Sequence, residues 1–95
     1  MRFEWDAAKS DANLEERGLD FAFASLVFEA STLEVEDSRR DYGERRVVAI
    51  GIADGLHLTV VYTDRQAAGG DVIRRIISAR RSSRHERKIY QKANP

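Results

Sequence analysis

The chain has 95 residues, with 16 Lys and Arg against 16 Asp and Glu, two histidines and no cysteine. This length predicts a single domain over residues 1–95. The absence of cysteine excludes disulfides, thiolate metal sites and cysteine nucleophiles. Because the two histidines are far apart in the sequence, we expect no metal or cofactor site. The charged N-terminus lacks the apolar core of a signal peptide and no apolar run approaches the roughly 20 residues that span a bilayer, so we expect a cytoplasmic protein with no membrane partner.

The N-terminal third is predicted to form two helices. Asp6 is a suitable N-cap for a helix over Ala7–Arg17, and Gly18 follows where a glycine favours helix termination. Asp20 can cap a second helix. The apolar and small residues of this second helix recur at i, i+3, i+4 and i+7, at Phe21, Ala24, Ser25 and Phe28. Because only two residues separate the two helices, we expect them to lie antiparallel.

Four strands are predicted to follow. They cover residues 33–37, 47–52, 58–63 and 72–79. The first has the marginal alternation of an edge strand, whereas the second is β-branched and apolar enough to be buried. Asp54-Gly55 is a strong signal for a two-residue hairpin, and polar or glycine-containing turns are expected at 38–44 and 67–71.

The C-terminal segment is predicted to be a basic helix. Ser83 and Glu86 match a capping box, in which each side chain satisfies a backbone donor of the other. The helix should continue to about Lys92, and residues 93–95 should fray. The sequence therefore predicts an α+β fold with two N-terminal helices, a four-stranded antiparallel sheet and a C-terminal helix. We expect the helices to cover one face of the sheet and to leave the other to solvent or a ligand.

The two parts of the chain carry opposite charges. Residues 1–64 contain 7 Lys and Arg against 14 Asp and Glu, a net of −7, and residues 65–95 contain 9 against 2, a net of +7. This asymmetry predicts a basic surface for a polyanion, with the alternative that the two parts neutralise each other in the fold.

The last predicted strand carries arginines where a central strand normally carries Val or Ile. Strand alternation places Arg74, Ser78 and Arg80 on one face and Arg75 on the other. Guanidinium groups bind phosphate oxygens in a bidentate way and stay charged, so converging arginines would suit phosphate binding. The alternative is that these arginines are solvated and paired with carboxylates of neighbouring strands.

Several other side chains have both a functional and a structural interpretation. Tyr62 either faces the arginines and contacts a ribose or phosphate, or packs in the sheet. Trp5 stacks on a base or anchors the first helix, and Lys9 contacts substrate or is plain surface. Glu86 is a general base or only a cap, and His85 is an alternative base or a solvated residue.

Five segments of the sequence also carry a resemblance. They are Phe3–Asp6 with Lys9, Asn13 and Arg17-Gly18; Asp41–Arg46; Val61–Thr63; Ile76–Arg80; and Glu86, Arg87 and Tyr90. In this order, over nearly the whole chain, they resemble the BrnT family of toxins. The resemblance implies a RelE-like fold and a ribonuclease that inhibits translation. It also implies a cognate antitoxin with a ribbon-helix-helix DNA-binding part, and a complex of the two that represses its own promoter.

The resemblance also implies site residues. The matching positions with an expected catalytic role are Arg46, Tyr62, Arg75, Arg80 and Glu86. Tyr90 matches a family position too, and the residues expected to bind substrate are Trp5, Lys9, Arg74, Arg81 and Tyr90, although Arg74 stands where the family usually has an aliphatic residue. Arg75, rather than Arg74, matches the family's strand arginine, which disagrees with strict alternation unless a bulge or register change intervenes. Where the family commonly has a histidine before the second helix, this chain has Arg17, which cannot serve as a base at neutral pH.

The function expected from these features is metal-free cleavage of mRNA by attack of the 2′-oxygen on the adjacent phosphorus, with RNA as substrate and promoter DNA contacted only through the antitoxin complex. Arginines would hold the scissile phosphate and stabilise the developing charge. The alternative is a non-catalytic protein- or nucleic-acid-binding module that acts with a repressor partner.

Overall fold

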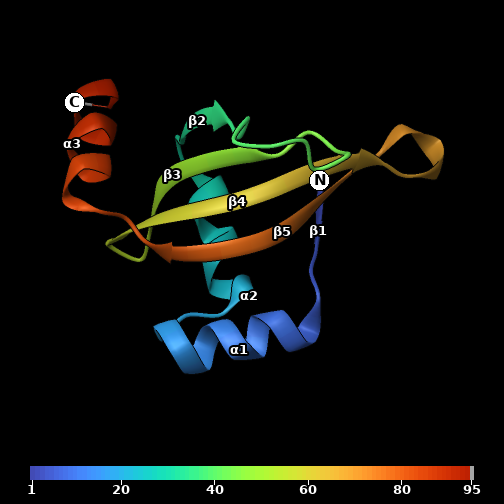
Figure 1. Cartoon of the computed structure of the whole chain (residues 1–95), viewed down its shortest axis with the longest axis horizontal. Helices are drawn as coiled ribbons and strands as arrows, with labels where there is room; N and C mark the ends of the chain where they lie inside the picture. The colour runs from blue at the N-terminus through green and yellow to red at the C-terminus, as the bar shows by residue number, and fades with distance from the viewer. Residues whose placement is uncertain (95) are drawn as a thin grey trace.

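The computed structural model describes residues 1–94, which form a five-stranded sheet with three α-helices (Figure 1). The strands are β1 (Arg2–Glu4), β2 (Leu33–Glu36), β3 (Val47–Ala53), β4 (Leu56–Gln66) and β5 (Val72–Arg81), in the order β1-β5-β4-β3-β2. The helices are α1 (Ala7–Arg17), α2 (Phe21–Ala24) and α3 (Arg84–Ala93), with short 3-10 segments at Ser25–Glu29 and Ala68–Gly70. No helix within residues 1–94 is long and apolar enough to cross a membrane.

The α+β prediction is confirmed, but the predicted four-stranded antiparallel sheet is wrong. The additional strand, β1, pairs in parallel with β5, so the sheet is mixed, and Glu4 lies opposite Arg75. Three residues are too few for the alternation that identifies a strand in a sequence, and the partner strand is about 70 residues away. The other strand pairs are antiparallel, and β2 forms the predicted edge.

The cap residues of the first two helices are confirmed. Asp6 accepts a hydrogen bond from the Lys9 backbone N–H at 3.0 Å, and Gly18 ends α1 with a φ of 79°. Asp20 accepts from the Phe23 N–H at 2.8 Å and starts α2. These side chains satisfy backbone donors that would otherwise have no partner at a helix start.

The second predicted helix is shorter than expected. It remains α-helical only to Ala24 and then tightens into the 3-10 segment Ser25–Glu29. The Ser25 hydroxyl donates to the Ala22 carbonyl at 2.7 Å, a local bond that competes with the regular helical pattern. The expected antiparallel arrangement is also wrong, because α2 and the 3-10 segment rise behind the sheet and run across α1 rather than alongside it (Figure 1).

The two faces of the sheet have different environments. The face covered by α1, α2 and the 3-10 segment, here called the helix face, holds the main core. Its fully buried side chains include Phe21, Val27, Leu58, Val60 and Ile76. The opposite face, here called the open face, carries Val48, Ile50, Thr59, Val61 and Ser78, and α3 packs only at its end. Val48, Val61 and Ser78 of this face are only partly buried, so part of the sheet is uncovered here.

The core requires a glycine at one position of β3. Gly51 lies against the 3-10 segment, and a Cβ atom on this residue would lie 3.0 Å from the Val27 Cβ and 3.1 Å from the Thr32 Cγ2. The Val27 contact is with a fully buried side chain that has no free space to move into.

We therefore predict that Gly51→Ala destabilises the fold. The extra methyl overpacks the contact between β3 and the 3-10 segment, which typically costs about 1–3 kcal/mol. Urea unfolding monitored by circular dichroism measures the change in the free energy of unfolding. A midpoint equal to or above that of the wild type would contradict this packing.

Candidate functional site

A bulge in β5 decides which arginines face the open side of the sheet. Val61 pairs with Ser78 but Tyr62 pairs with Ile76, so Ile77 is the extra residue and the pairing shifts there. As a result Arg75 lies opposite Thr63 and shares the open face with Ser78 and Arg80. The alternation predicted from the sequence, with Arg74 beside Ser78 and Arg80, is wrong because it assumes a strand without a bulge.

A groove of about 580 Å³ lies on the open face around Arg80. Its floor is formed by Val48, Ile50, Thr59, Val61 and Ser78, and its walls by residues 35–39 on one side and His85, Glu86 and Ile89 of α3 on the other. Arg17 reaches the same groove from the end of α1 and donates to the Ala79 carbonyl at 2.9 Å. Three of the five floor residues are aliphatic, so the charged side chains of the groove lie in its walls and at its rim.

Glu86 holds Arg80 in a defined orientation. The Arg80 Nη1 and Nη2 atoms donate to the two Glu86 oxygens at 2.7 and 2.9 Å, and Nη1 also donates to the Arg81 carbonyl at 3.3 Å. Arginine has five N–H donors, so the Nε hydrogen and the second Nη2 hydrogen remain. These two lie side by side on one edge of the guanidinium, the geometry that matches two oxygens of a phosphate.

The same carboxylate fixes the start of α3. Glu86 accepts from the Ser83 backbone N–H at 2.7 Å while the Ser83 hydroxyl accepts from the Glu86 N–H at 3.1 Å, so the predicted capping box is confirmed. The hydrogen bonds from Arg80, opposed by partial burial, lower the pKa of Glu86 from 4.5 to about 2. Glu86 is therefore a weak base, and its position serves to orient Arg80.

Asp37 organises the loop that forms the opposite wall of the groove. Its side chain is only 2% exposed and accepts from the Arg39 backbone N–H at 3.3 Å, from the Arg39 guanidinium at 2.8 Å through both oxygens, and from the Tyr42 hydroxyl at 3.2 Å. The Arg39 hydrogen bond holds the pKa of Asp37 well below its ordinary value, despite the desolvation that opposes it. The loop is thus tied down, and Arg39 is kept at the rim.

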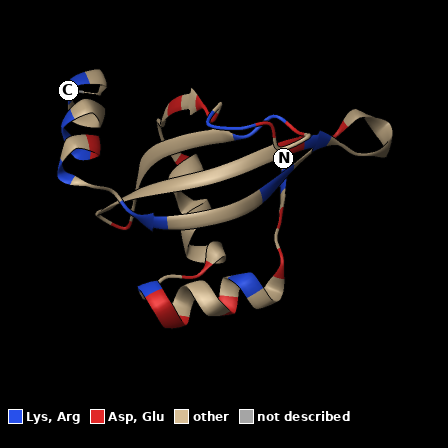
Figure 2. Ribbon diagram, in the orientation of Figure 1, with Lys and Arg blue, Asp and Glu red and all other residues tan. Residues whose placement is uncertain are grey.

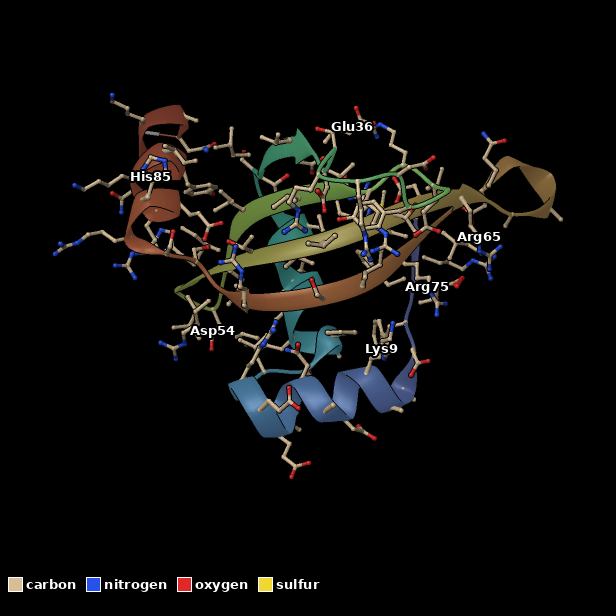
Figure 3. The ribbon with its side chains drawn as sticks, viewed as in Figure 1. Lys9, Glu36, Asp54, Arg65, Arg75 and His85 are labelled. Atoms are coloured by element: carbon tan, nitrogen blue, oxygen red, sulfur yellow. The ribbon has the colours of Figure 1, made fainter. Side chains whose placement is uncertain are left out.

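Arg46 and Arg75 lie at the other end of the open face. Arg46 stacks over the Tyr42 ring at 4.1 Å and donates to Glu44 at 3.1 Å. Arg75 donates to Glu4 of β1 at 3.0 Å, and Glu4 also accepts from Arg65 at 2.6 Å. Figure 3 shows Arg65 and Arg75 together at this end, away from His85. Neither Arg46 nor Arg75 lines the groove around Arg80.

Tyr62 and Arg74 lie on the helix face, as the packing interpretation of Tyr62 predicts, whereas Arg75 and Arg80 lie on the open face. The Tyr62 hydroxyl donates to Glu34 at 2.5 Å, and burial together with this bond raises the Tyr62 pKa above its ordinary value. Arg74 lies over the rings of Tyr62 and Phe28 at 3.9 and 4.7 Å and forms two hydrogen bonds of 2.8 Å with Asp64. Its side chain is 12% exposed. These contacts are those of a packing and pairing residue.

The remaining expected substrate-binding residues also lie outside the groove. Trp5 packs against the main core, as its anchor interpretation predicts. Lys9 is exposed on α1, on the helix side of the sheet (Figure 3). Tyr90 is buried, donates to the Ser31 carbonyl at 2.9 Å and contacts the His57 ring edge-on. Arg81 lies on the helix-face side at the end of β5, opposite Leu58.

The sequence did not identify two elements of the groove. Arg39 was expected in a turn and Asp37 at the end of a strand. An Asp side chain that accepts a hydrogen bond from the backbone N–H two residues later is a known turn signal, and it could have indicated this loop. His85 was considered only as an alternative base, yet it lines the groove beside Glu86. Within residues 1–94 no group of three or more His, Asp or Glu side chains is arranged to hold a metal ion.

A family model described as a ribonuclease toxin, BrnT, of type II toxin–antitoxin systems matches residues 5–86. This range contains Arg80, Glu86 and the whole of the loop that Asp37 organises. A search of curated proteins gives no match.

The Glu86 pKa leads to a prediction for Glu86→Gln. A carboxylate whose pKa is lowered by folding contributes stability that is complete above its ordinary pKa and is lost as the pH falls through the folded value. The wild type should therefore lose more stability than Glu86→Gln between pH 4.5 and about 2. Melting temperatures of both proteins across this range measure the difference, and parallel curves would show that the Arg80–Glu86 pair does not stabilise the fold.

Proposed function

The chain belongs to the BrnT family of ribonuclease toxins of type II toxin–antitoxin systems, and from this premise we propose that it is a metal-independent endoribonuclease that cleaves mRNA and so inhibits translation in the cytoplasm. The observation that carries the proposal is the free donor fork of Arg80. This fork is oriented by Glu86 and lies at the rim of a groove on an otherwise uncovered sheet face.

The reaction proposed is internal transfer of the phosphodiester. The ribose 2′-oxygen loses its proton and bonds to the adjacent phosphorus, and the 5′-oxygen of the next nucleotide leaves and takes up a proton. The products are a 2′,3′-cyclic phosphate and a 5′-hydroxyl. Arg80 supports this step because its two remaining N–H groups can donate to the phosphate oxygens as negative charge builds on them.

His85 is the group best suited to accept the 2′-hydroxyl proton. It lines the groove beside Glu86, and a neutral imidazole has a ring nitrogen that can accept a proton. Glu86 is assigned a positioning role in place of the expected general base, since both of its oxygens bind Arg80 and its pKa is about 2. Tyr62 has no part in this proposal, because its hydroxyl donates to Glu34 on the helix face.

Arg46 and Arg75 are assigned to RNA further along the open face. Thr59 pairs with Arg80 and Thr63 with Arg75, four residues apart on β4, which corresponds to roughly 13 Å at ~3.3 Å per residue. We therefore assign them to a different phosphate from the one held by Arg80. Arg46 and Arg75 each donate one hydrogen bond to a carboxylate and keep further N–H donors, so their contribution should be to affinity rather than to the chemical step.

An antitoxin partner follows from membership of a type II system, and we propose that it carries a ribbon-helix-helix part through which the complex binds promoter DNA. Edge strand β2 is a candidate docking element, because it pairs only with β3 and its Val35 is 61% exposed. An uncovered strand edge of this kind supports strand addition by a partner.

We predict that Arg80→Ala abolishes RNA cleavage while leaving the fold intact. Removing one donor to a developing charge typically costs about 10²–10³ in kcat. The measurement is degradation of RNA in EDTA by the purified chain, together with growth arrest on expression. Arg2→Ala is the matched control, since Arg2 is an exposed arginine paired with Asp71 at the far edge of the sheet. RNA that stays intact with the wild-type chain in EDTA would instead favour the non-catalytic binding module.

We further predict that His85→Ala slows RNA cleavage. Loss of a general base typically lowers the rate about 10²–10⁴-fold. Single-turnover cleavage rates of the wild type and the variant measure the effect. An unchanged rate in the variant would assign the proton transfer to another group.

A further inference from the structure

A second, smaller pocket lies at the end of the sheet, where the β3–β4 hairpin meets the start of α3. Its volume is about 180 Å³, which corresponds to roughly six waters at ~30 Å³ each. The side chains that line it include His57, Arg81 and Arg87, with Gly55, Leu56 and Ser82 completing the wall. Among residues 1–94, no Asp or Glu lines this pocket. Its backbone is fixed, because the Ser82 N–H donates to the His57 carbonyl at 2.9 Å.

The two arginines of this pocket differ from the expected catalytic arginines. Arg80, Arg75 and Arg46 each bind a carboxylate. Within residues 1–94, in contrast, neither Arg81 nor Arg87 makes an ion pair. Figure 2 shows this end of β5 and much of α3 in the colour of Lys and Arg. All five N–H donors of a guanidinium without a carboxylate partner remain available to an anion, so this pocket is a candidate anion site.

We propose that the pocket formed by His57, Arg81 and Arg87 binds the backbone phosphate of the nucleotide next to the one cleaved. This assignment rests on the proposed ribonuclease function, because it takes Arg80 as the position of the scissile phosphate. Arg80 and Arg81 are consecutive residues that point to opposite faces at the end of β5. An RNA strand that passes from the groove around the end of β5 therefore reaches the side of the sheet on which Arg81 lies.

The chemistry of the pocket favours a phosphate over a base. Two guanidinium groups and an imidazole offer several N–H donors and no carboxylate acceptor, which suits an anion with several oxygens. Its only aromatic side chain is that of His57, whose ring already contacts Tyr90 edge-on. Contacts with backbone phosphates contribute to affinity and fix the position of the RNA on the protein, but they do not recognise its sequence.

The proposal is tested by binding of a 2′-O-methyl RNA tetranucleotide, which cannot react because its 2′-oxygens are blocked. Arg87→Ala should weaken binding about tenfold, the loss typical of one hydrogen bond to a charged group. The slope of log affinity against log salt should become shallower by about 0.7, as expected for one phosphate contact of a single strand. Arg87→Lys keeps the charge and should recover part of the affinity.

Arg84→Ala is the matched control. Arg84 belongs to the same helix and carries the same charge, but it does not line the pocket. Equal losses for Arg84→Ala and Arg87→Ala would overturn the proposal, because they would indicate a diffuse effect of charge. Titration with inorganic phosphate provides a second readout. The NMR resonances of the His57 ring should move in the wild type and move less in Arg87→Ala, and resonances that do not move in the wild type would also overturn it.

A dinucleotide substrate separates this site from the catalytic one. It contains only the scissile phosphodiester, so Arg87→Ala should cleave it at the wild-type rate and should show a raised KM only for longer RNA. Impaired cleavage of the dinucleotide by Arg87→Ala would place Arg87 at the reaction instead. If the wild-type chain cleaves no RNA, the ribonuclease proposal fails, whereas Arg87-dependent binding of the tetranucleotide and of phosphate would still support a phosphate-binding pocket.

Discussion

The pairing of β4 with β5 shifts by one residue at Ile77, and this shift determines the chemistry of both faces of the sheet. Before the bulge, Arg75 belongs to the open face and Arg74 to the helix face. After it, Ser78 and Arg80 are on the open face. Without the extra residue, Arg75 would lie on the helix face and Arg74 on the open face. The bulge thus allows one strand to supply arginines for a ligand and still bury Ile76 in the core.

The second constraint is the carboxylate of Glu86, which connects the end of β5 to the start of α3. It caps the helix through Ser83 and holds Arg80 through two hydrogen bonds. Because one side chain performs both tasks, the position of α3 as a wall of the groove is coupled to the orientation of the arginine at its rim. A low pKa follows from the same contacts, so Glu86 stays ionised at pH values above about 2.

The basic residues fall into two groups with different uses. Arginines of the sheet are paired with carboxylates, as in Arg74 with Asp64 and Arg75 with Glu4, so part of the opposite charge of the two halves is neutralised internally. The arginines at the end of β5 and on α3 that line the small pocket remain unpaired within residues 1–94. Both interpretations of the charge asymmetry therefore apply, each to a different part of the surface. Net charge alone did not distinguish them, because it carries no information about which groups are in contact.

The sequence by itself determined the features that depend on local interactions. Cap residues such as Asp6 and Ser83, the Asp54-Gly55 hairpin with both φ angles positive, and four of the five strands could be predicted because their signals lie within a few residues. The family could be recognised for a related reason, since its motifs occur in order along the chain. Strand β1, the bulge at Ile77 and the packing of Tyr62 on the helix face were decided only by the tertiary structure. Each depends on contacts with a segment that is distant in the sequence. Such contacts produce no periodic pattern in the residues of the segment itself.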